Sequence, residues 1–313
     1  MSKVSRRKFL AGSLAGGVAA MLAPVKKVLA SGDFRGFPDG MGVLVDLTRC
    51  VGCRSCEAAC NKEQGLPAPD LPFDDDSVFD ETFHHGTQKR RTTEKAYTVV
   101  NRYEPKDSDQ PVYRKVQCNH CNEPACLTSC FVKAYTKTNE GAVIYDEHVC
   151  VGCRTCMVAC PHNIPAYAYS KVIDPVVKKC IFCYDTRVSK GRPPACVEIC
   201  PAEALTFGKR KDLLRLARAR IKSSPEKYQQ EIYGEHTVGG SAWMYIAGVP
   251  FEELGFDTTL PNEPIINNVK GFLGMVPMVL AIWPALFTGF HLLATKNKDH
   301  DHHDDSHTGE GEK

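Results

Sequence analysis

CVGCRSCEAAC, residues 50–60, returns almost unchanged one hundred residues later as CVGCRTCMVAC, residues 150–160. Both copies space their cysteines as C-x2-C-x2-C-x3-C. The 313-residue chain contains 16 cysteines, and all of them belong to four groups that open with C-x2-C and close with C-x3-C. The groups are Cys50, Cys53, Cys56 and Cys60; Cys118, Cys121, Cys126 and Cys130; Cys150, Cys153, Cys156 and Cys160; and Cys180, Cys183, Cys196 and Cys200. No cysteine is left over, so four sets of four thiols organise the chain.

This spacing is typical of bacterial ferredoxins, in which three cysteines of a run hold one [4Fe–4S] cluster and the fourth ligates another. Proline commonly follows the fourth cysteine, as Pro161 and Pro201 do here, whereas Asn61 and Phe131 take that place in the first two groups. At four cysteines per cluster, the sequence predicts four [4Fe–4S] clusters. Disulfide bonds would not select so tight a spacing. Structural zinc would explain only the second and fourth groups taken alone.

The N-terminus combines a basic start with a mild apolar run, Phe9 to Ala23. SRRKFL, residues 5–10, matches the twin-arginine export signal, with cleavage expected after Ala30. The alternative is a short membrane anchor, for which this apolar run is short. Residues 1–30 are therefore predicted to be a twin-arginine signal peptide. Such a route suits clusters assembled in the reducing cytosol and then carried to the periplasm in a folded protein.

The C-terminal region contains an uncharged stretch, GFLGMVPMVLAIWPALFTGFHLLA, which covers 24 residues at 271–294. A helix of this length spans roughly 36 Å, against a bilayer core of about 30 Å. We therefore predict a transmembrane helix at residues 270–295, with a buried core helix as the alternative. Lys296 and Lys298 place its C-terminal end in the cytoplasm. The predicted location is thus the cytoplasmic (inner) membrane, crossed once, with the main domain in the periplasm.

Two features near the C-terminus have an open interpretation. His291 lies inside the predicted span, where an ionisable residue is a candidate for function, although packing against a neighbouring helix is the alternative. The His- and Asp-rich tail, residues 296–313, is predicted to be solvated rather than a metal site. KRKDLLRLARARI, residues 209–221, is predicted to be an amphipathic basic helix that packs on the core or docks a partner.

Short alternating segments adjoin the cysteine groups and predict strands: GVLVDL (42–47), VYRKVQC (112–118), AVIYDEHVC (142–150) and ALTFGK (204–209). Short strands and helices around cluster loops are typical of the bacterial ferredoxin unit. The predicted fold class is α+β.

Four groups with these gaps, in this order, resemble the four-cluster electron-transfer subunits of membrane-bound oxidoreductases. That family includes the iron–sulfur subunits of respiratory formate dehydrogenase, dimethyl sulfoxide reductase and nitrate reductase. The export signal, the uncharged C-terminal stretch and IYGEHTVGGSAWMYIAGVPFEELGF (232–256) together are most similar to the HybA-type subunit of quinone-linked [NiFe] hydrogenase. The resemblance extends from Ser5 to about Ala294.

The resemblance implies that the groups pair crosswise, the first with the fourth and the second with the third. It implies four ligand sets: site 1, Cys50, Cys53, Cys56 and Cys200; site 2, Cys118, Cys121, Cys126 and Cys160; site 3, Cys150, Cys153, Cys156 and Cys130; site 4, Cys180, Cys183, Cys196 and Cys60. Some relatives replace one cysteine by tryptophan and hold a [3Fe–4S] cluster. Because every position here is cysteine, four [4Fe–4S] clusters are expected, bound through iron by all sixteen thiolates.

The same pairing sets the expected domains. Residues 40–62 with 173–210 form the first ferredoxin-like unit, and residues 113–172 form the second. Residues 63–112 are a polar, charged surface insertion, and residues 211–269 are a C-terminal extension before the transmembrane helix.

The implied function is an electron relay, without a catalytic residue of its own. Two partners are expected. One is a catalytic subunit, for which a [NiFe] hydrogenase is preferred to a molybdopterin oxidoreductase. The other is an integral membrane subunit that reacts with quinone. The alternatives are the same relay in a formate dehydrogenase, in a sulfur-compound reductase or in a cytochrome-linked quinone reductase complex. An enzyme that uses a cluster as its active site would need an iron without a cysteine ligand, and sixteen cysteines leave none. The net charge of +2 argues neither for nor against nucleic acid, and no nucleic-acid partner is expected.

Overall fold

The computed structural model describes residues 39–69, 71–79, 89–106, 108–169 and 176–304. The predicted signal peptide and residues 305–313 of the predicted tail lie outside the described residues. The chain divides into two units, of which Arg35–Asn267 is one. Within the described part of the other unit lies the C-terminal helix α7 (Asn267–Asp304).

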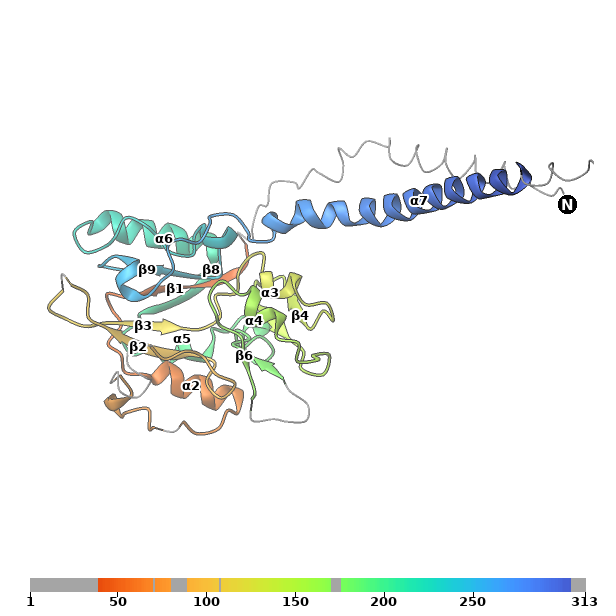
Figure 1. Ribbon diagram of the computed structural model, residues 1–313. Helices are drawn as coiled ribbons and strands as arrows, with labels where there is room; N and C mark the ends of the chain where they lie inside the picture. The colour runs from red at the N-terminus through yellow and green to blue at the C-terminus, as the bar shows by residue number, and fades with distance from the viewer. Residues whose placement is uncertain (1–38, 70, 80–88, 107, 170–175, 305–313) are drawn as a thin grey trace, which may run out of the picture. The chain divides into compact units, whose positions relative to one another are not determined.

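The unit Arg35–Asn267 contains a three-stranded sheet (Figure 1). Strand β1 (Met41–Asp46) lies in the middle, with β8 (Leu205–Lys209) antiparallel on one side and β9 (Trp243–Ile246) parallel on the other. The predicted strands before the first cysteine group and after the fourth are therefore confirmed as neighbours. The sheet therefore joins a segment that precedes the first cysteine group to segments that follow the fourth.

The two faces of this sheet bury different layers because side chains alternate along a strand. Val43 and Val45 pack with a core of aromatic side chains that also contains Cys196. Leu44, on the opposite face, packs with helix α6 (Arg210–Ser223). The apolar stripe of α6 consists of Leu213, Leu214, Ala217 and Ile221, all of them buried. The amphipathic helix expected at residues 209–221 therefore packs on the core, where each buried leucine contributes roughly 1.5–3 kcal/mol.

The remaining elements are short and adjoin the cysteine groups. Three antiparallel pairs are β2 (Val99–Tyr103) with β3 (Val112–Val116), β4 (Tyr135–Lys137) with β5 (Val143–Tyr145), and β6 (Ala166–Tyr167) with β7 (Val177–Lys178). Four α-helices carry cysteines, namely α2 (Ser55–Gln64), α3 (Ala125–Thr128), α4 (Thr155–Ala159) and α5 (Ala195–Glu198). Short 3-10 turns are η2 (Asp76–Phe79), η4 (Val188–Lys190), η5 (Thr237–Gly239) and η6 (Phe251–Leu254). Helix α2 packs against α5 and α3 against α4, so the groups meet as first with fourth and second with third.

Two expectations differ from the structure. Residues 63–112, expected to be a polar surface insertion, include β2, in which Val99 and Val100 are buried. Strand β2 pairs with β3, and four of its five residues are buried, so that part belongs to the core. The transmembrane helix expected at residues 270–295 is not confirmed. Although α7 covers this stretch, no helix among the described residues has an apolar run long enough to cross a membrane.

Candidate iron–sulfur sites

All four C-x2-C loops share one backbone feature. The residue just before the second cysteine has a positive φ in every loop: 72° at Gly52, 48° at His120, 67° at Gly152 and 66° at Phe182. This left-handed conformation turns the chain sharply, which costs a non-glycine residue roughly 1–2 kcal/mol. In two loops the turn directs a backbone N–H at a cysteine sulfur, with N···S distances of 3.4 Å from Gly152 to Cys150 and from Phe182 to Cys180. Such hydrogen bonds favour the charged thiolate, which is the form that binds iron.

The third cysteine of each group also has a constant place. Cys56, Cys126, Cys156 and Cys196 are each the second residue of a helix. In the first and third groups the loop therefore presents three thiols within one turn and the start of a helix, whereas four and twelve residues separate the second and third cysteines of the second and fourth groups. The fourth cysteine differs between groups, because Cys60 lies inside α2, which continues to Gln64, whereas Cys160 ends α4.

The electrostatic neighbours of Cys60 come from the other end of the unit. Burial raises the pKa of the Cys60 thiol, and the nearby Cys180, Cys196 and Cys183 raise it further. Burial likewise raises the pKa of Cys50 to about 11, with additional contributions from Cys200 and Cys53. The structure therefore brings together members of sites 4 and 1, whose binding of iron stays a prediction.

The second and third groups show the same exchange. Burial raises the pKa of Cys121, and its cysteine neighbours Cys118, Cys160 and Cys126 add to the shift. Burial also raises the pKa of Cys156, near which lie Cys150, Cys130 and Cys153. These are the members of sites 2 and 3, so each fourth cysteine lies with the partner group's first three.

Further pKa shifts give the order of the four sites. Burial raises the pKa of Cys56 of site 1, and among the neighbouring cysteines Cys196 of site 4 adds most to this shift. Cys118 of site 2 is the first cysteine that adds to burial in raising the pKa of Cys180 of site 4 to about 12. Sites 2 and 3 adjoin through Cys126 and Cys156. The order is therefore 1, 4, 2, 3.

The chemistry of the donor set fits iron–sulfur clusters. All sixteen thiols are free of disulfide bonds. Within the described residues, no three His, Cys, Asp or Glu side chains converge on the position of a single metal ion. A cubane cluster has no such requirement, because each of its four irons takes one cysteine. Burial raises the pKa of several thiols, so iron has to displace their protons when a cluster binds.

Buried cations lie among the sites. Lys115 is 3% exposed, and its ammonium group donates to Thr98 Oγ1 at 2.7 Å and lies 4.6 Å from the Trp243 ring centroid. Burial lowers the pKa of Lys115, but the surrounding Cys196 and Cys56 outweigh it and raise the pKa overall. A positive charge therefore lies between sites 1 and 4. Nothing in the local sequence indicates that Lys115 is buried beside the cysteines.

Five basic residues near the motifs have two possible roles, as counter-charges to the clusters or as plain surface charges. They are Arg49, Arg54, Arg154, Lys178 and Lys179. Only Arg54 and Lys179 are buried. Lys179 donates to the carbonyl oxygens of Val143 and Cys180, at 2.5 and 2.9 Å. The other three are partly or fully exposed, as surface charges are.

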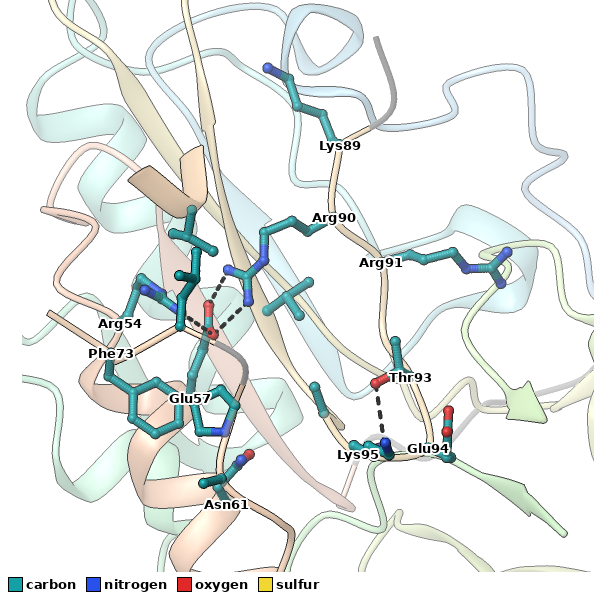
Figure 2. Close-up of a pocket in the computed structure, with 16 residues that line it drawn as sticks. Arg54, Glu57, Asn61, Phe73, Lys89, Arg90, Arg91, Thr93, Glu94 and Lys95 are labelled. Carbon is teal, nitrogen blue, oxygen red and sulfur yellow. Dashed lines mark hydrogen bonds and ion pairs between the residues drawn. The ribbon is translucent and has the colours of Figure 1, made fainter. Parts of the chain in front are cut away.

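A cavity of about 450 Å³ adjoins the loop of site 1 (Figure 2). The Glu57 carboxylate, 2% exposed, accepts two hydrogen bonds of 2.9 Å from Arg90, one of 2.6 Å from the Val100 N–H and one of 3.4 Å from Arg54. Arg54 also donates to the carbonyl oxygens of Pro72 and Asp75. These hydrogen bonds tie the insertion to helix α2, although Arg54 Nε has no hydrogen-bond partner among the described residues.

The chain is similar to several known proteins. The family described as 4Fe-4S dicluster domain matches residues 110–210. A protein of Nitratidesulfovibrio vulgaris is 49% identical over 95% of this chain and 78% of its own length. Hydrogenase-2 operon protein HybA of Escherichia coli O157:H7 is 31% identical over 96% of this chain and 98% of its own length. The iron-sulfur subunit of nitrate-inducible formate dehydrogenase of Escherichia coli K12 is 32% identical over 84% of this chain and 88% of its own length.

Proposed function

Because this chain belongs to the family of iron–sulfur electron-transfer subunits of hydrogenase, formate dehydrogenase and dimethyl sulfoxide reductase type, we propose that it relays electrons through four [4Fe–4S] clusters between a catalytic subunit and a quinone-reactive membrane subunit. It is an electron-transfer subunit and not the catalytic one. Binding of 4Fe–4S clusters follows from the dicluster domain and the 16 cysteines. The number of clusters and the partners are the proposal.

The observation that carries the proposal is the exposure of the two end sites. Cys53 of site 1 and Cys153 of site 3 are exposed, whereas Cys60, Cys183 and Cys196 of site 4 are buried. Apolar side chains surround the two ends, with Val51 60% and Val151 56% exposed. A row of sites that is enclosed in the middle and open at both ends suits a path between two docked partners.

Each cluster, when bound, takes up one electron and passes one on without breaking a bond. The chain itself holds the thiolates at fixed positions and keeps water from the interior sites. Buried cations such as Lys115 and Lys179 offset the negative charge of the thiolates. Cluster potentials depend on charge, hydrogen bonds and burial.

The proposed catalytic partner is a [NiFe] hydrogenase, since the likeness to HybA covers nearly the full length of both chains. A molybdopterin enzyme is the second candidate, since the formate dehydrogenase subunit matches at similar identity over less of both chains. Purification in mild detergent followed by mass spectrometry of the associated subunits decides between them. A co-purified hydrogenase large subunit would support the first candidate. A co-purified molybdopterin subunit would support the second candidate instead.

The proposed location is the periplasmic face of the cytoplasmic membrane, and this part rests on the sequence alone. The signal motif at residues 5–10 and the uncharged segment at 271–294 support export and anchoring. A chain that ends before Lys270 should leave the membrane fraction and keep its brown colour in the soluble periplasm. Retention of that shortened chain in carbonate-washed membranes would exclude anchoring by this segment.

Metal analysis tests the four-cluster relay. Four cubane clusters contain about 16 iron atoms and about 16 sulfide ions per chain. We expect both values in protein purified without oxygen. A reproducible iron content near 12 would remove one cluster from the proposal.

A further inference from the structure

His120 lies at the junction of the two ferredoxin-like units. It is fully buried and occupies the loop between Cys118 and Cys121, the first two cysteines of site 2. Its ring packs against the ring of Phe182, with the ring centroids 4.8 Å apart and the planes tilted by 31°. Phe182 occupies the equivalent position in the loop of site 4. The imidazole is therefore enclosed between the loops of two neighbouring sites.

The hydrogen bonding of His120 determines where its proton lies. Its Nδ1 accepts the Val143 N–H at 2.9 Å, so a neutral ring carries its hydrogen on Nε2. Lys179, Lys137 and Lys115 lie near the ring. The Nε2 atom is buried and has no hydrogen-bond partner among the described residues. A buried N–H without an acceptor is costly, so the site needs an acceptor beyond the side chains and backbone around it.

We propose that the His120 Nε2–H donates a hydrogen bond to a sulfur of the cluster at this junction, in site 2 or site 4, and raises its reduction potential. The sulfurs of a cluster are hydrogen-bond acceptors, and they gain negative charge when the cluster takes up its one electron. A donor therefore stabilises the reduced form more than the oxidised form. His120 acts as a positioning and tuning residue on the step between the two units. The inference rests on the proposed relay.

Two substitutions separate the two nitrogens of the ring. In His120→Asn, the amide oxygen takes the place of Nδ1 and can accept the Val143 N–H, but the donor at Nε2 is lost. In His120→Gln, the amide nitrogen reaches the place of Nε2 and donates, while the acceptor for Val143 is lost. Asparagine also tolerates the positive φ of 48° at this position. If His120 only holds the Val143 N–H, His120→Gln should be the more harmful substitution. If its Nε2–H donates to a cluster, His120→Asn should be the more harmful one.

The experiment is a redox titration of the full chain, followed by electron paramagnetic resonance. For His120→Asn we expect the oxidised-to-reduced ratio of one junction cluster, at fixed potential, to rise about tenfold, which is about 59 mV for one electron. His120→Gln should change that ratio less than threefold. His148→Asn, at an exposed histidine in the same unit, is the matched control and should leave all potentials unchanged.

Three results would overturn the proposal. The first is unchanged potentials in His120→Asn, as expected if a buried water accepts the hydrogen bond from Nε2–H. The second is equal shifts in the Asn and Gln variants. The third is a shift confined to site 1 or site 3. Iron analysis comes first, because wild-type protein without about 16 iron atoms contradicts the relay itself and not the role of His120.

A second measurement applies if His120→Asn fails to assemble. Pulsed resonance on the native chain labelled with 15N-histidine should detect a nitrogen coupled to a reduced junction cluster. That coupling should disappear in His120→Gln, and its absence from the native chain would overturn the proposal.

Discussion

Cys60→Ala is the sharpest test of the crossed arrangement. Cys60 is 6% exposed and lies within α2, ten residues after Cys50 in the sequence. A local arrangement would make it a ligand of site 1. In the structure its cysteine neighbours are Cys180, Cys196 and Cys183, all more than one hundred residues away in the sequence. Alanine supplies no ligand, so we expect damage at site 4.

The expected magnitude follows from one lost ligand at one cluster. Site 4 accounts for four irons, so the content should fall from about 16 to about 15 if a three-iron cluster remains, and to about 12 if the cluster is lost. Because site 4 lies between sites 1 and 2, electrons that enter at site 1 should no longer reach site 3 at the native rate. Anaerobic iron and sulfide analysis measures the first effect, and stopped-flow reduction measures the second.

Electron paramagnetic resonance of the reduced protein identifies the affected cluster. Cys60→Ala and Cys196→Ala should alter the same signal, and Cys200→Ala should match Cys53→Ala. If Cys60→Ala instead matched Cys53→Ala and left the signal affected by Cys196→Ala intact, the crossed arrangement would be refuted.

Three further changes test other parts of the structure. Glu57→Ala leaves the buried Arg54 uncompensated, so the free energy of unfolding by denaturant should fall by about 3–5 kcal/mol; an unchanged value would contradict the role of this network. Lys115→Met removes a buried positive charge, so a redox titration should show lower reduction potentials at sites 1 and 4 alone. Lys115→Arg retains the charge and should leave these potentials at their native values. Equal effects of both variants would argue for a packing role instead. Replacement of Arg6 and Arg7 by lysine should retain the precursor in the cytoplasm, as cell fractionation measures, and normal export would reject the twin-arginine signal.

The cysteine loops were predictable because their information is local. C-x2-C requires only a tight turn, and Gly52 and Gly152 indicate the left-handed residue that makes it. His120 and Phe182 take the same conformation without any such indication, because the surrounding packing compensates a modest strain. The alternating strand at residues 42–47 was likewise recognisable and forms β1.

The parts that sequence reasoning missed depend on distant partners. Strand β9 lies in the segment expected to be an extension, and all four of its residues are buried, so it shows no alternation. Its pairing with β1 joins positions about two hundred residues apart. Glu57 and Arg90 are residue types usually found at the surface, and only the fold brings them together. Neither partner is visible from local periodicity.

The central sheet also has a consequence for the order of biosynthesis. β1, at residues 41–46, is made early, but its partners β8 and β9 appear only once synthesis has passed residues 205 and 243. The second and third cysteine groups, at 118–160, are complete well before that. A nascent chain can therefore enclose sites 2 and 3 first, while the first group waits for its partners. Loading of iron should begin in the unit of sites 2 and 3, and a chain that ends before residue 180 should carry at most half of the clusters.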